Sequence, residues 1–463
     1  MKRLSSVLLA ACILLSLVAC GQKNTAAKPD MDPGIAALSD EEYFAQAFTP
    51  TFRFLVCSDI HVDDYGTKIE EDRIGQMMDA AYSYVEDQAD GVPLSGVMVA
   101  GDIADNGTLR AMQKCVRLLK DSLHAETELW ISMGNHDFYA EGENSPAIFC
   151  YATGYESEDN HVVISGYHFI LVSPDKNGKG YSKDKQKFLA DALKEAAADD
   201  PTGRKPIFVI QHHHVSDTVY GSDRWGTEDL RQTLNKYPQV VDFSGHSHFP
   251  IDDPTSIWQG EFTALGTGTL SYSEVGIAGL YPDSVWPVGT DGAYTTAAPW
   301  ENDGVKVKDL AQFYIVEIDQ NQAIRILGYD LLSESFFMDP LLLRSVGDPT
   351  TFRYTKDRAA TSEAPYFDAS ATLSVESRTT QEITFRFPQA HSKDTVQNYR
   401  CEVYLGDRLV QTEYRLACTF YTPAPESLTV PVTLAGSGHY TVKIFGVNSF
   451  AVSGEPLIVE FDA

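Results

Sequence analysis

Five apolar segments of this chain each run directly into a short cluster of acidic, amide or histidine side chains. These segments are strand-like and cover residues 51–57, 96–101, 128–134, 206–211 and 239–245. Amphipathic, helix-like stretches lie between them, at residues 68–88, 108–123 and 183–198. Such alternation is typical of layered α+β or α/β folds. In open α/β sheets, binding sites form at the carboxyl ends of the strands, so we expect the five clusters to converge.

The five clusters read SDIH, GDIAD, GNHD, HHH and GHSH. Each cluster alone is typical of a turn, a helix cap or a surface loop. Five such clusters, in order after successive strands, are not explained by turns, caps and loops. They offer imidazole nitrogen and carboxylate or amide oxygen, which suit hard and borderline cations. No cysteine lies in them, which excludes a thiolate zinc site. One carboxylate shared by two ions would make a two-metal centre, the kind that clamps both oxygens in phosphoryl transfer.

The ordered set DxH, GDxxD, GNHD, H and GHxH resembles the calcineurin-like metallophosphoesterase family. The resemblance implies a β-sandwich of two mixed sheets flanked by helices, which we expect over residues 49–350. It also implies two divalent metal ions (Mn, Fe or Zn) and attack of a metal-bound hydroxide on a phosphate mono- or diester. One ion would be held by Asp59, His61 and His248, the other by Asn135, His212 and His246, and Asp102 would bridge them.

The same resemblance implies that His136 is a catalytic residue and not a ligand. It would contact the phosphate and assist the leaving group, with Asp105 as its orienting partner.

The triplet His212, His213 and His214 leaves the ligand open. The family commonly has H-x-P here, and this chain has no proline: His213 is the ligand if Val215 takes the proline's place, and His212 is if His214 takes it. His212 is favoured because it directly follows the apolar strand. The other two histidines are candidates for contacting the substrate or supporting the ligands, as are three residues of the following loop, Tyr220, Arg224 and Trp225.

The amino terminus has two basic residues, an apolar stretch from Leu4 to Ala19 and the sequence LVAC. This stretch is short for a membrane span, and the pattern resembles a bacterial lipoprotein signal peptide over residues 1–19. The resemblance implies cleavage before Cys20, lipid on its thiol, and export with the catalytic domain anchored to the membrane outside the cytoplasm. The polar residues that follow, within 20–48, are typical of a tether.

The carboxyl-terminal part, residues 365–463, has short alternating strands and a turn signal at Gly406-Asp407. It resembles a fibronectin type III-like β-sandwich, and we expect it to fold as a unit of its own. The five cysteines after Cys20 cannot all pair, and whether Cys401 and Cys418 do is left open.

A formal net charge of −29 argues against a nucleic acid polymer as partner, but not against a small phosphate ester bound at metal ions. We therefore expect an exported, lipid-anchored dimetal phosphoesterase. The alternatives are an extracytoplasmic nucleotidase or cyclic-nucleotide phosphodiesterase, and a non-catalytic surface binding protein that retains the fold. The complete ligand set and His136 favour an enzyme.

Overall fold

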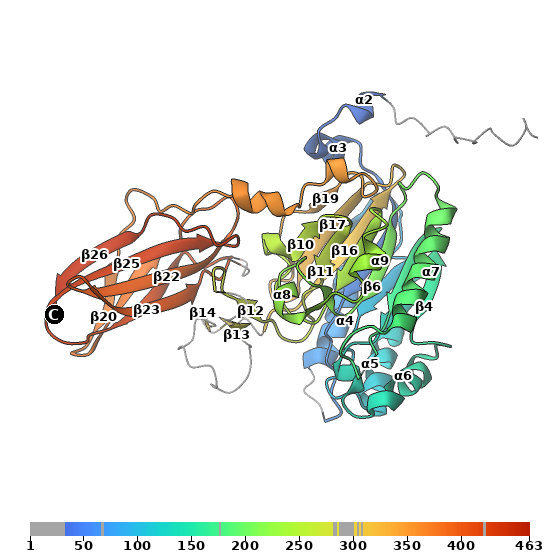
Figure 1. Cartoon of the computed structure of the whole chain (residues 1–463), viewed down its shortest axis with the longest axis horizontal. Helices are drawn as coiled ribbons and strands as arrows, with labels where there is room; N and C mark the ends of the chain where they lie inside the picture. Colours follow the sequence, from blue (N-terminus) through green and yellow to red (C-terminus); the bar gives the residue numbers. More distant parts are fainter. Residues whose placement is uncertain are drawn as a thin grey trace, which may run out of the picture. The chain divides into compact units, whose positions relative to one another are not determined.

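The computed structural model describes residues 33–65, 69–175, 177–280, 309–419 and 423–463, and the backbone of the strand pairs at 285–286, 301–302 and 305–306 (Figure 1). The predicted signal peptide and Cys20 lie outside these residues. The chain divides into two compact units, residues 1–47 and 48–463. This division does not separate the predicted carboxyl-terminal unit, so the boundary near residue 365 stays a prediction. Within the described residues, we find no helix both long and apolar enough to cross a membrane.

The first unit contains two short helices, α2 (Pro33–Ala36) and α3 (Asp40–Gln46). A capping box begins α3: the Ser39 hydroxyl accepts from the Glu42 amide at 3.2 Å, and the Glu42 carboxylate accepts from the Ser39 amide at 3.0 Å. Part of the predicted tether is therefore helical, because these reciprocal bonds satisfy amides that the first turn leaves open.

The larger unit begins with a mixed sheet whose order is β18-β17-β16-β1-β2-β3, with β19 beside β17. Strands β1, β2 and β3 are parallel, β16 runs antiparallel to β1, and β17 runs antiparallel to β16. Its strands are β1 (Pro50–Cys57), β2 (Gly96–Ala100), β3 (Glu128–Ser132), β16 (Gln312–Asp319), β17 (Ile324–Asp330), β18 (Ser335–Phe336) and β19 (Leu341–Leu343).

A second mixed sheet has the order β10-β11-β9-β6-β5-β4, with β5, β6, β9 and β11 parallel. The predicted hairpin is its β4–β5 edge, where Ser165 and Gly166 both have positive φ, as a two-residue turn requires. Its strands are β4 (Asn160–Ile164), β5 (Tyr167–Val172), β6 (Ile207–Gln211), β9 (Val240–Ser244), β10 (Ile257–Gln259) and β11 (Thr263–Gly266).

The two sheets pack face to face, and helices cover their outer faces. In β1, Leu55 and Cys57 face the helices, while Phe54 and Val56 face the second sheet. The Phe54 ring lies 4.8 Å from that of Phe208 across the sheets. The helices are α4 (Ile69–Asp87), α5 (Leu109–Asp121) and α6 (Ser145–Thr153) on the first sheet, and α7 (Lys183–Asp199) and α9 (Arg231–Leu234) on the second. This arrangement confirms the predicted layered fold.

Short elements connect these layers. They are η1 (His136–Phe138), η2 (Gly142–Asn144), β7 (His214–Val215), α8 (Ser222–Trp225), β8 (Gly226–Thr227), η3 (Pro254–Ser256), β12 (Val275–Gly276), β13 (Val285–Trp286), β14 (Glu301–Asn302), β15 (Val305–Lys306), η5 (Pro349–Thr351) and η6 (Lys356–Thr361).

The carboxyl-terminal region is all antiparallel, in a three-stranded sheet β20-β21-β24 and a four-stranded sheet β23-β22-β25-β26. The two share one core. Gly406, with φ of 57°, and Asp407 form the predicted hairpin turn. Cys401 and Cys418 are thiols in the structure. The strands are β20 (Ser374–Arg378), β21 (Glu382–Pro388), β22 (Val396–Leu405), β23 (Arg408–Leu416), β24 (Ser427–Thr433), β25 (His439–Asn448) and β26 (Leu457–Asp462).

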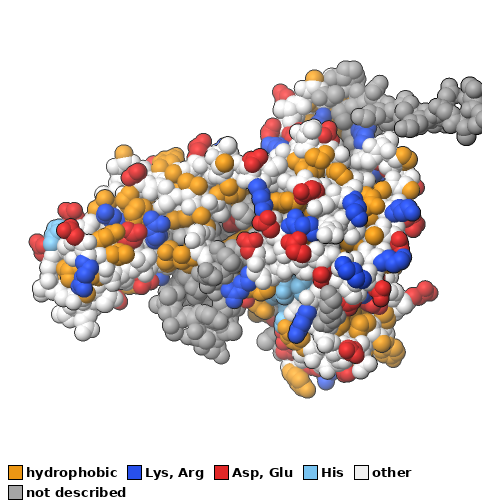
Figure 2. Space-filling view, viewed as in Figure 1, with side chains coloured by type: hydrophobic (Ala, Val, Ile, Leu, Met, Phe, Trp, Pro, Cys, Tyr) orange, Lys and Arg blue, Asp and Glu red, His pale blue; other side chains and the backbone are white. Residues whose placement is uncertain are grey.

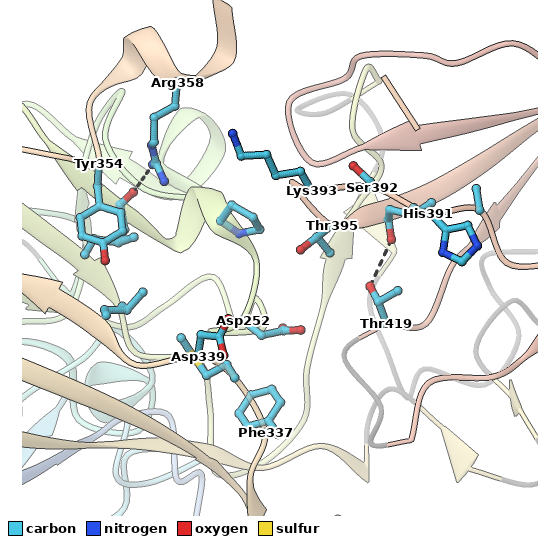
Figure 3. Close-up of a pocket in the computed structure, with 16 residues that line it drawn as sticks. Asp252, Phe337, Asp339, Tyr354, Arg358, His391, Ser392, Lys393, Thr395 and Thr419 are labelled. Atoms are coloured by element: carbon cyan, nitrogen blue, oxygen red, sulfur yellow. Dashed lines mark hydrogen bonds between the residues drawn. The ribbon is translucent and has the colours of Figure 1, made fainter. Parts of the chain in front are cut away.

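Between the two-sheet body and the carboxyl-terminal strands lies a cavity of about 560 Å³ (Figure 3). Asp252, Phe337 and Arg358 line it on one side, and Lys393 and Thr395 on the other. None of the seven predicted metal ligands lines it.

A fully buried carboxyl group lies on the helix-covered face of β9. Asp242 accepts one hydrogen bond, from the Gln211 amide nitrogen at 3.0 Å, while its Oδ1 and the Gln211 Oε1 have no partner. Burial raises the pKa of Asp242 to about 7, with the Gln211 bond opposing the shift. A proton on this carboxyl would supply the donor that Gln211 Oε1 lacks.

Because its folded pKa lies above the ordinary 3.8, the stability that Asp242 contributes is present below about pH 3.8 and is lost as the pH rises to about 7. We expect Asp242→Asn to abolish this loss of folding stability, because an amide at position 242 does not ionise as the pH rises. Between those pH values, metal-free wild type should lose about 1.4 kcal/mol per pH unit relative to the variant. Denaturant unfolding at several pH values measures it, and a difference that does not vary with pH would contradict it.

Candidate metal centre

The predicted clusters meet at the carboxyl ends of the parallel strands in the two sheets. After β1, the Asp59 amide donates to Gly101 O at 3.1 Å beyond β2. The Asp59 carboxylate in turn accepts from the His246 amide at 3.0 Å beyond β9. These bonds join three of the clusters, and contacts of Asp102 with the His136 amide and with His212 bring in the other two.

Three groups of side chains in the described residues could each hold a metal ion, with ligand atoms within 4.8 Å of one another. They are Asp59 with His61 and His248, Asp102 with His212 and His246, and His61 with Asp102 and His136. The first two groups correspond to the two predicted ion sites. Asp102 also belongs to the third group, together with His61 of the first site.

Asp102 has the geometry of a shared ligand. Its Oδ1 accepts from the His136 amide at 2.8 Å. Its Oδ2 is buried, has no hydrogen-bond partner, and lies 3.2 Å from His212 Nε2 and 3.8 Å from His61 Nε2. A buried carboxylate oxygen without a donor is costly, and a cation on each side would satisfy it.

The atoms around the first site crowd together in the same way. His248 Nε2 lies 3.1 Å from Asp59 Oδ1 and 3.2 Å from His61 Nε2. In the second site, Asn135 Oδ1 lies 2.9 Å from His212 Nε2, and the His246 ring centre is 4.9 Å from that of His212. The residues therefore fit divalent cations bound by mixed nitrogen and oxygen ligands.

An acceptor holds the second nitrogen of His212 and of His248, and that of His61 lies near a carboxylate without a hydrogen bond, which leaves Nε2 of each ring for an ion. His212 Nδ1 pairs with Ala100 O at 2.9 Å and His248 Nδ1 with Tyr272 O at 2.8 Å. His61 Nδ1 lies 3.4 Å from the Asp105 carboxylate. Carbonyl and carboxylate partners of this kind set the tautomer of metal-bound histidines.

The pKa shifts agree with this donor set. Burial lowers the pKa of His246 well below its usual value, so the ring stays neutral with a lone pair to donate. Burial works against ionisation of Asp102, yet His212 beside it lowers the pKa of this carboxyl to about 2. Burial also lowers the pKa of His212, but Asp102 and Asp59 outweigh this and raise it to about 9. A cation would take the place of that proton.

Five of the seven predicted ligands have left-handed backbone conformations that are rare for residues other than glycine. The φ angles are 52° at Asp59, 53° at His61, 51° at Asp102, 74° at His246 and 58° at His248. Each costs on the order of 1 kcal/mol or more, and such strain gathers at functional sites.

Two motif glycines leave room for the ligands. A Cβ on Gly134 would lie 2.1 Å from Asp102 Oδ1, and one on Gly245 would lie 2.4 Å from Asp59 Oδ2. A side chain at either position would displace a carboxylate of the site.

The geometry at the histidine triplet favours His212 as the ligand. His214 is fully buried, and its two nitrogens pair with the hydroxyls of Ser244 and Ser247 at 2.7 and 2.8 Å. It therefore supports the GHSH loop from behind. His213 is buried with its ring centre 4.6 Å from that of His246.

His136 lies beside the centre with its side chain partly exposed. Its Nδ1 donates to the main-chain oxygen of Asp105 at 2.7 Å, whereas the Asp105 carboxylate is 3.8 Å away. The predicted partnership between these residues therefore runs through the backbone, and the carboxylate lies closer to His61.

Two of the three candidates in the loop after β7, Tyr220 and Trp225, pack on Phe249, the residue that follows His248. The ring centre of Tyr220 is 4.1 Å from that of Phe249, and the centre of Trp225 is 5.4 Å from it. Arg224 is exposed, with its guanidinium 5.0 Å from the Trp225 ring centre. Tyr220 directs its hydroxyl to the main chain of Gly276.

Sequence reasoning gave no role to two residues that organise the centre. Asp137 is fully buried and accepts hydrogen bonds from the main-chain amides of Gly134 at 2.8 Å and Ala104 at 3.1 Å. These bonds hold the GNHD motif against the GDIAD motif. The place of Asp137 in the GNHD motif was the available signal. Tyr139 accepts from the Asn135 amide nitrogen at 3.0 Å and so turns Oδ1 toward His212; no sequence pattern marks it.

The comparisons with solved structures are weak. A β-glucuronidase from Parabacteroides merdae is 9% identical, with a TM-score of 0.24, and the match covers 88% of this chain and 61% of that enzyme. The chain thus spans less than two thirds of it. A glycoside hydrolase domain of Endo-D from Streptococcus pneumoniae R6 is 11% identical over 82% of this chain and 64% of its own, with a TM-score of 0.19. Such scores do not indicate a shared fold.

The sequence comparisons give one specific result. No curated protein sequence matches the chain. The family model for calcineurin-like phosphoesterases matches residues 52–250. Residues 52–250 are therefore similar to calcineurin-like phosphoesterases, and this stretch contains all seven predicted metal ligands.

Proposed function

We propose that the chain hydrolyses phosphate mono- or diesters at two divalent metal ions, of which Mn, Fe and Zn all suit the donors. The observation that carries the proposal is the buried, unpartnered Oδ2 of Asp102 between His61 and His212. Asp59, His61 and His248 would hold one ion, and Asn135, His212 and His246 the other. When bound, such ions activate water and neutralise charge on a transferring phosphoryl group.

The side chains around the ions would do the remaining work. The His136 ring lies 4.5 Å from that of His61, within reach of a phosphate at the centre, and its Nδ1 is already engaged by Asp105 O. Its Nε2 is then the nitrogen that would meet the substrate, and in the imidazolium form, with both nitrogens protonated, it would give its proton to the leaving oxygen. Asp137 and Tyr139 would keep the loop of Asn135 and His136 in place.

A panel of phosphate esters, tested on metal-reconstituted full-length protein, examines this function. We expect hydrolysis of nitrophenyl phosphate or bis-nitrophenyl phosphate and loss of activity with a chelator, restored by added metal. Faster turnover of nucleotides or cyclic nucleotides would narrow the function to a nucleotidase or cyclic-nucleotide phosphodiesterase. Tight metal binding without hydrolysis of any ester would contradict the proposal and favour a binding protein.

We also propose export and lipid attachment at Cys20, which rests on the basic start, the apolar stretch and LVAC. The catalytic domain would then lie outside the cytoplasm, anchored to a bacterial membrane. Intact-mass analysis of membrane-extracted protein should find an acylated Cys20 terminus, and a mature chain beginning at Met1 would rule this out. A fibronectin type III-like identity for residues 365–463 is likewise proposed, supported by seven antiparallel strands around one core.

The charge of the chain fits a small substrate better than a polymer. On the face drawn in Figure 2, acidic and basic side chains are interspersed, without a broad basic surface. A net charge of −29 would repel an extended polyphosphate, whereas a single phosphate ester meets mainly the local field of the metal ions.

A further inference from the structure

One wall of the first ion site is the segment of residues 272–278, which lies in the chain between β11 of the second sheet and β16 of the first. Tyr272 O accepts from His248 Nδ1 at 2.8 Å, and the Glu274 amide donates to His248 O at 3.0 Å. The Tyr272 ring centre lies 4.3 Å from that of His248. The position of this segment therefore sets the orientation of the His248 ring.

The far end of the same segment is held by the carboxyl-terminal strands. Gln397 of β22 donates from Nε2 to Gly276 O at 2.6 Å and accepts at Oε1 from the Ala278 amide at 3.1 Å. Its Nε2 also lies 3.2 Å from the Tyr220 hydroxyl, which bonds both main-chain groups of Gly276. Gln397 is only 7% exposed, so these bonds do not compete with bulk water.

Gln397 occupies a β-bulge. In the pairing of β22 with β25, Val396 lies opposite Asn448 and Asn398 opposite Val447, so Gln397 is the extra residue between them. A bulge turns a side chain away from the regular alternation, and bulges are frequent beside functional sites. Here the irregularity directs the amide at the segment that supports His248.

The surroundings of this contact are loosely packed. The cavity of Figure 3 reaches Thr395 and Val396, and a second one of about 340 Å³ is lined by Tyr220, Ala278 and Gln397. Apolar packing is therefore interrupted at this boundary, and direct hydrogen bonds to residues 276–278 come from Gln397 and from Asn398, whose Nδ2 donates to Ala278 O at 3.3 Å.

We infer that Gln397 is a positioning residue for the first metal site, through which the carboxyl-terminal β-sandwich holds the His248 wall in place. The inference rests on the proposed function, in that Asp59, His61 and His248 bind one ion. It gives the carboxyl-terminal strands a role in metal binding, although none of the predicted ligands lies in them.

The test is metal binding by full-length Gln397→Leu, which removes the side-chain hydrogen bonds of Gln397 at similar volume. We expect affinity for one of two ions to fall by about 10–100-fold, as for other partners that orient metal ligands. The other ion should bind as in wild type. Asp217→Asn is the control, because its carboxylate pairs with Lys356 at the same boundary without touching residues 272–278, and it should leave both affinities unchanged.

Double variants identify which ion is affected. In a His248→Ala background, Gln397→Leu should cause little further loss, because the group that it orients is gone. In a His246→Ala background, the remaining ion should still be weakened in full. Equal effects in both backgrounds, or unchanged affinities, would overturn the inference.

A second variant and the number of ions bound by wild type separate a folding defect from a failure of either proposal. If Gln397→Leu does not fold by circular dichroism, Gln397→Glu replaces it, since a carboxylate still accepts from Ala278 but cannot donate to Gly276 O. A wild-type chain that binds fewer than two ions would contradict the proposed function itself. Two ions in wild type, and two ions bound with wild-type affinity in both Gln397 variants, would contradict only the role of Gln397.

Discussion

Asp102→Ala is expected to lose most of both metal ions and nearly all phosphoesterase activity. The carboxylate has one oxygen fixed by the His136 amide and the other buried between His61 and His212. Its removal takes the shared negative charge from both sites at once. Elemental analysis should fall from about two ions per chain to well under one, with a rate loss of at least about 10²–10³-fold, as when one preorganised electrostatic group is removed.

The matched control is Asp64→Asn, which removes a carboxylate from the same region of the chain. Asp64 accepts from the Thr108 hydroxyl at 2.8 Å and belongs to none of the metal-binding groups. It should keep both ions. If one ion per chain survived in Asp102→Ala with unchanged affinity, Asp102 would not be shared. Asp102→Asn, which retains an acceptor for the His136 amide, separates loss of charge from loss of loop structure.

The layered fold was predictable because its central strands are buried on both faces. Such strands appear as unbroken apolar runs between helices, and β1, β2, β6 and β9 begin and end within one or two residues of the predicted bounds. Helix α6 was missed. Its sequence, SPAIFCYAT, carries apolar residues around the whole helix and offers no amphipathic period.

The residue types of the centre could be read from the motifs, but the groups that orient them could not. The partners of His212 and His248 are the main-chain carbonyls of Ala100 and Tyr272, and any residue supplies a carbonyl. The acceptor for His136 is likewise the backbone of Asp105. Such partners depend on the path of the chain in space, which no local pattern encodes.

The same reason explains why Tyr220 and Gln397 were not linked in advance. The loop of Tyr220 is a candidate for contacting the substrate or supporting the ligands because it follows a ligand strand. Its hydroxyl instead joins Gly276 and the bulged Gln397 of β22. A bulge depends on the register between β22 and β25, and register is set by long-range pairing.

The second large effect concerns His136, where chemistry and metal holding can be separated. His136→Asn should keep both ions, because the amide that fixes Asp102 belongs to the backbone and Asn135 is unchanged. It should lose about 10²–10⁴-fold in rate on alkyl phosphate esters, whose leaving oxygen needs a proton. The loss should be smaller on nitrophenyl esters, which depart as stable anions. Metal content and both rates are measured on the same preparations.

Asp105→Asn is the informative comparison for His136. It leaves the carbonyl that accepts from His136 Nδ1 but removes the carboxylate 3.4 Å from His61 Nδ1. We therefore expect Asp105→Asn to weaken one metal ion moderately, with a similar rate loss on alkyl and nitrophenyl esters, because His136 keeps its partner. The role of His136 is wrong if His136→Asn loses its ions in step with its activity. It is equally wrong if that variant keeps full turnover on alkyl esters, because a proton donor would then be unnecessary at this position.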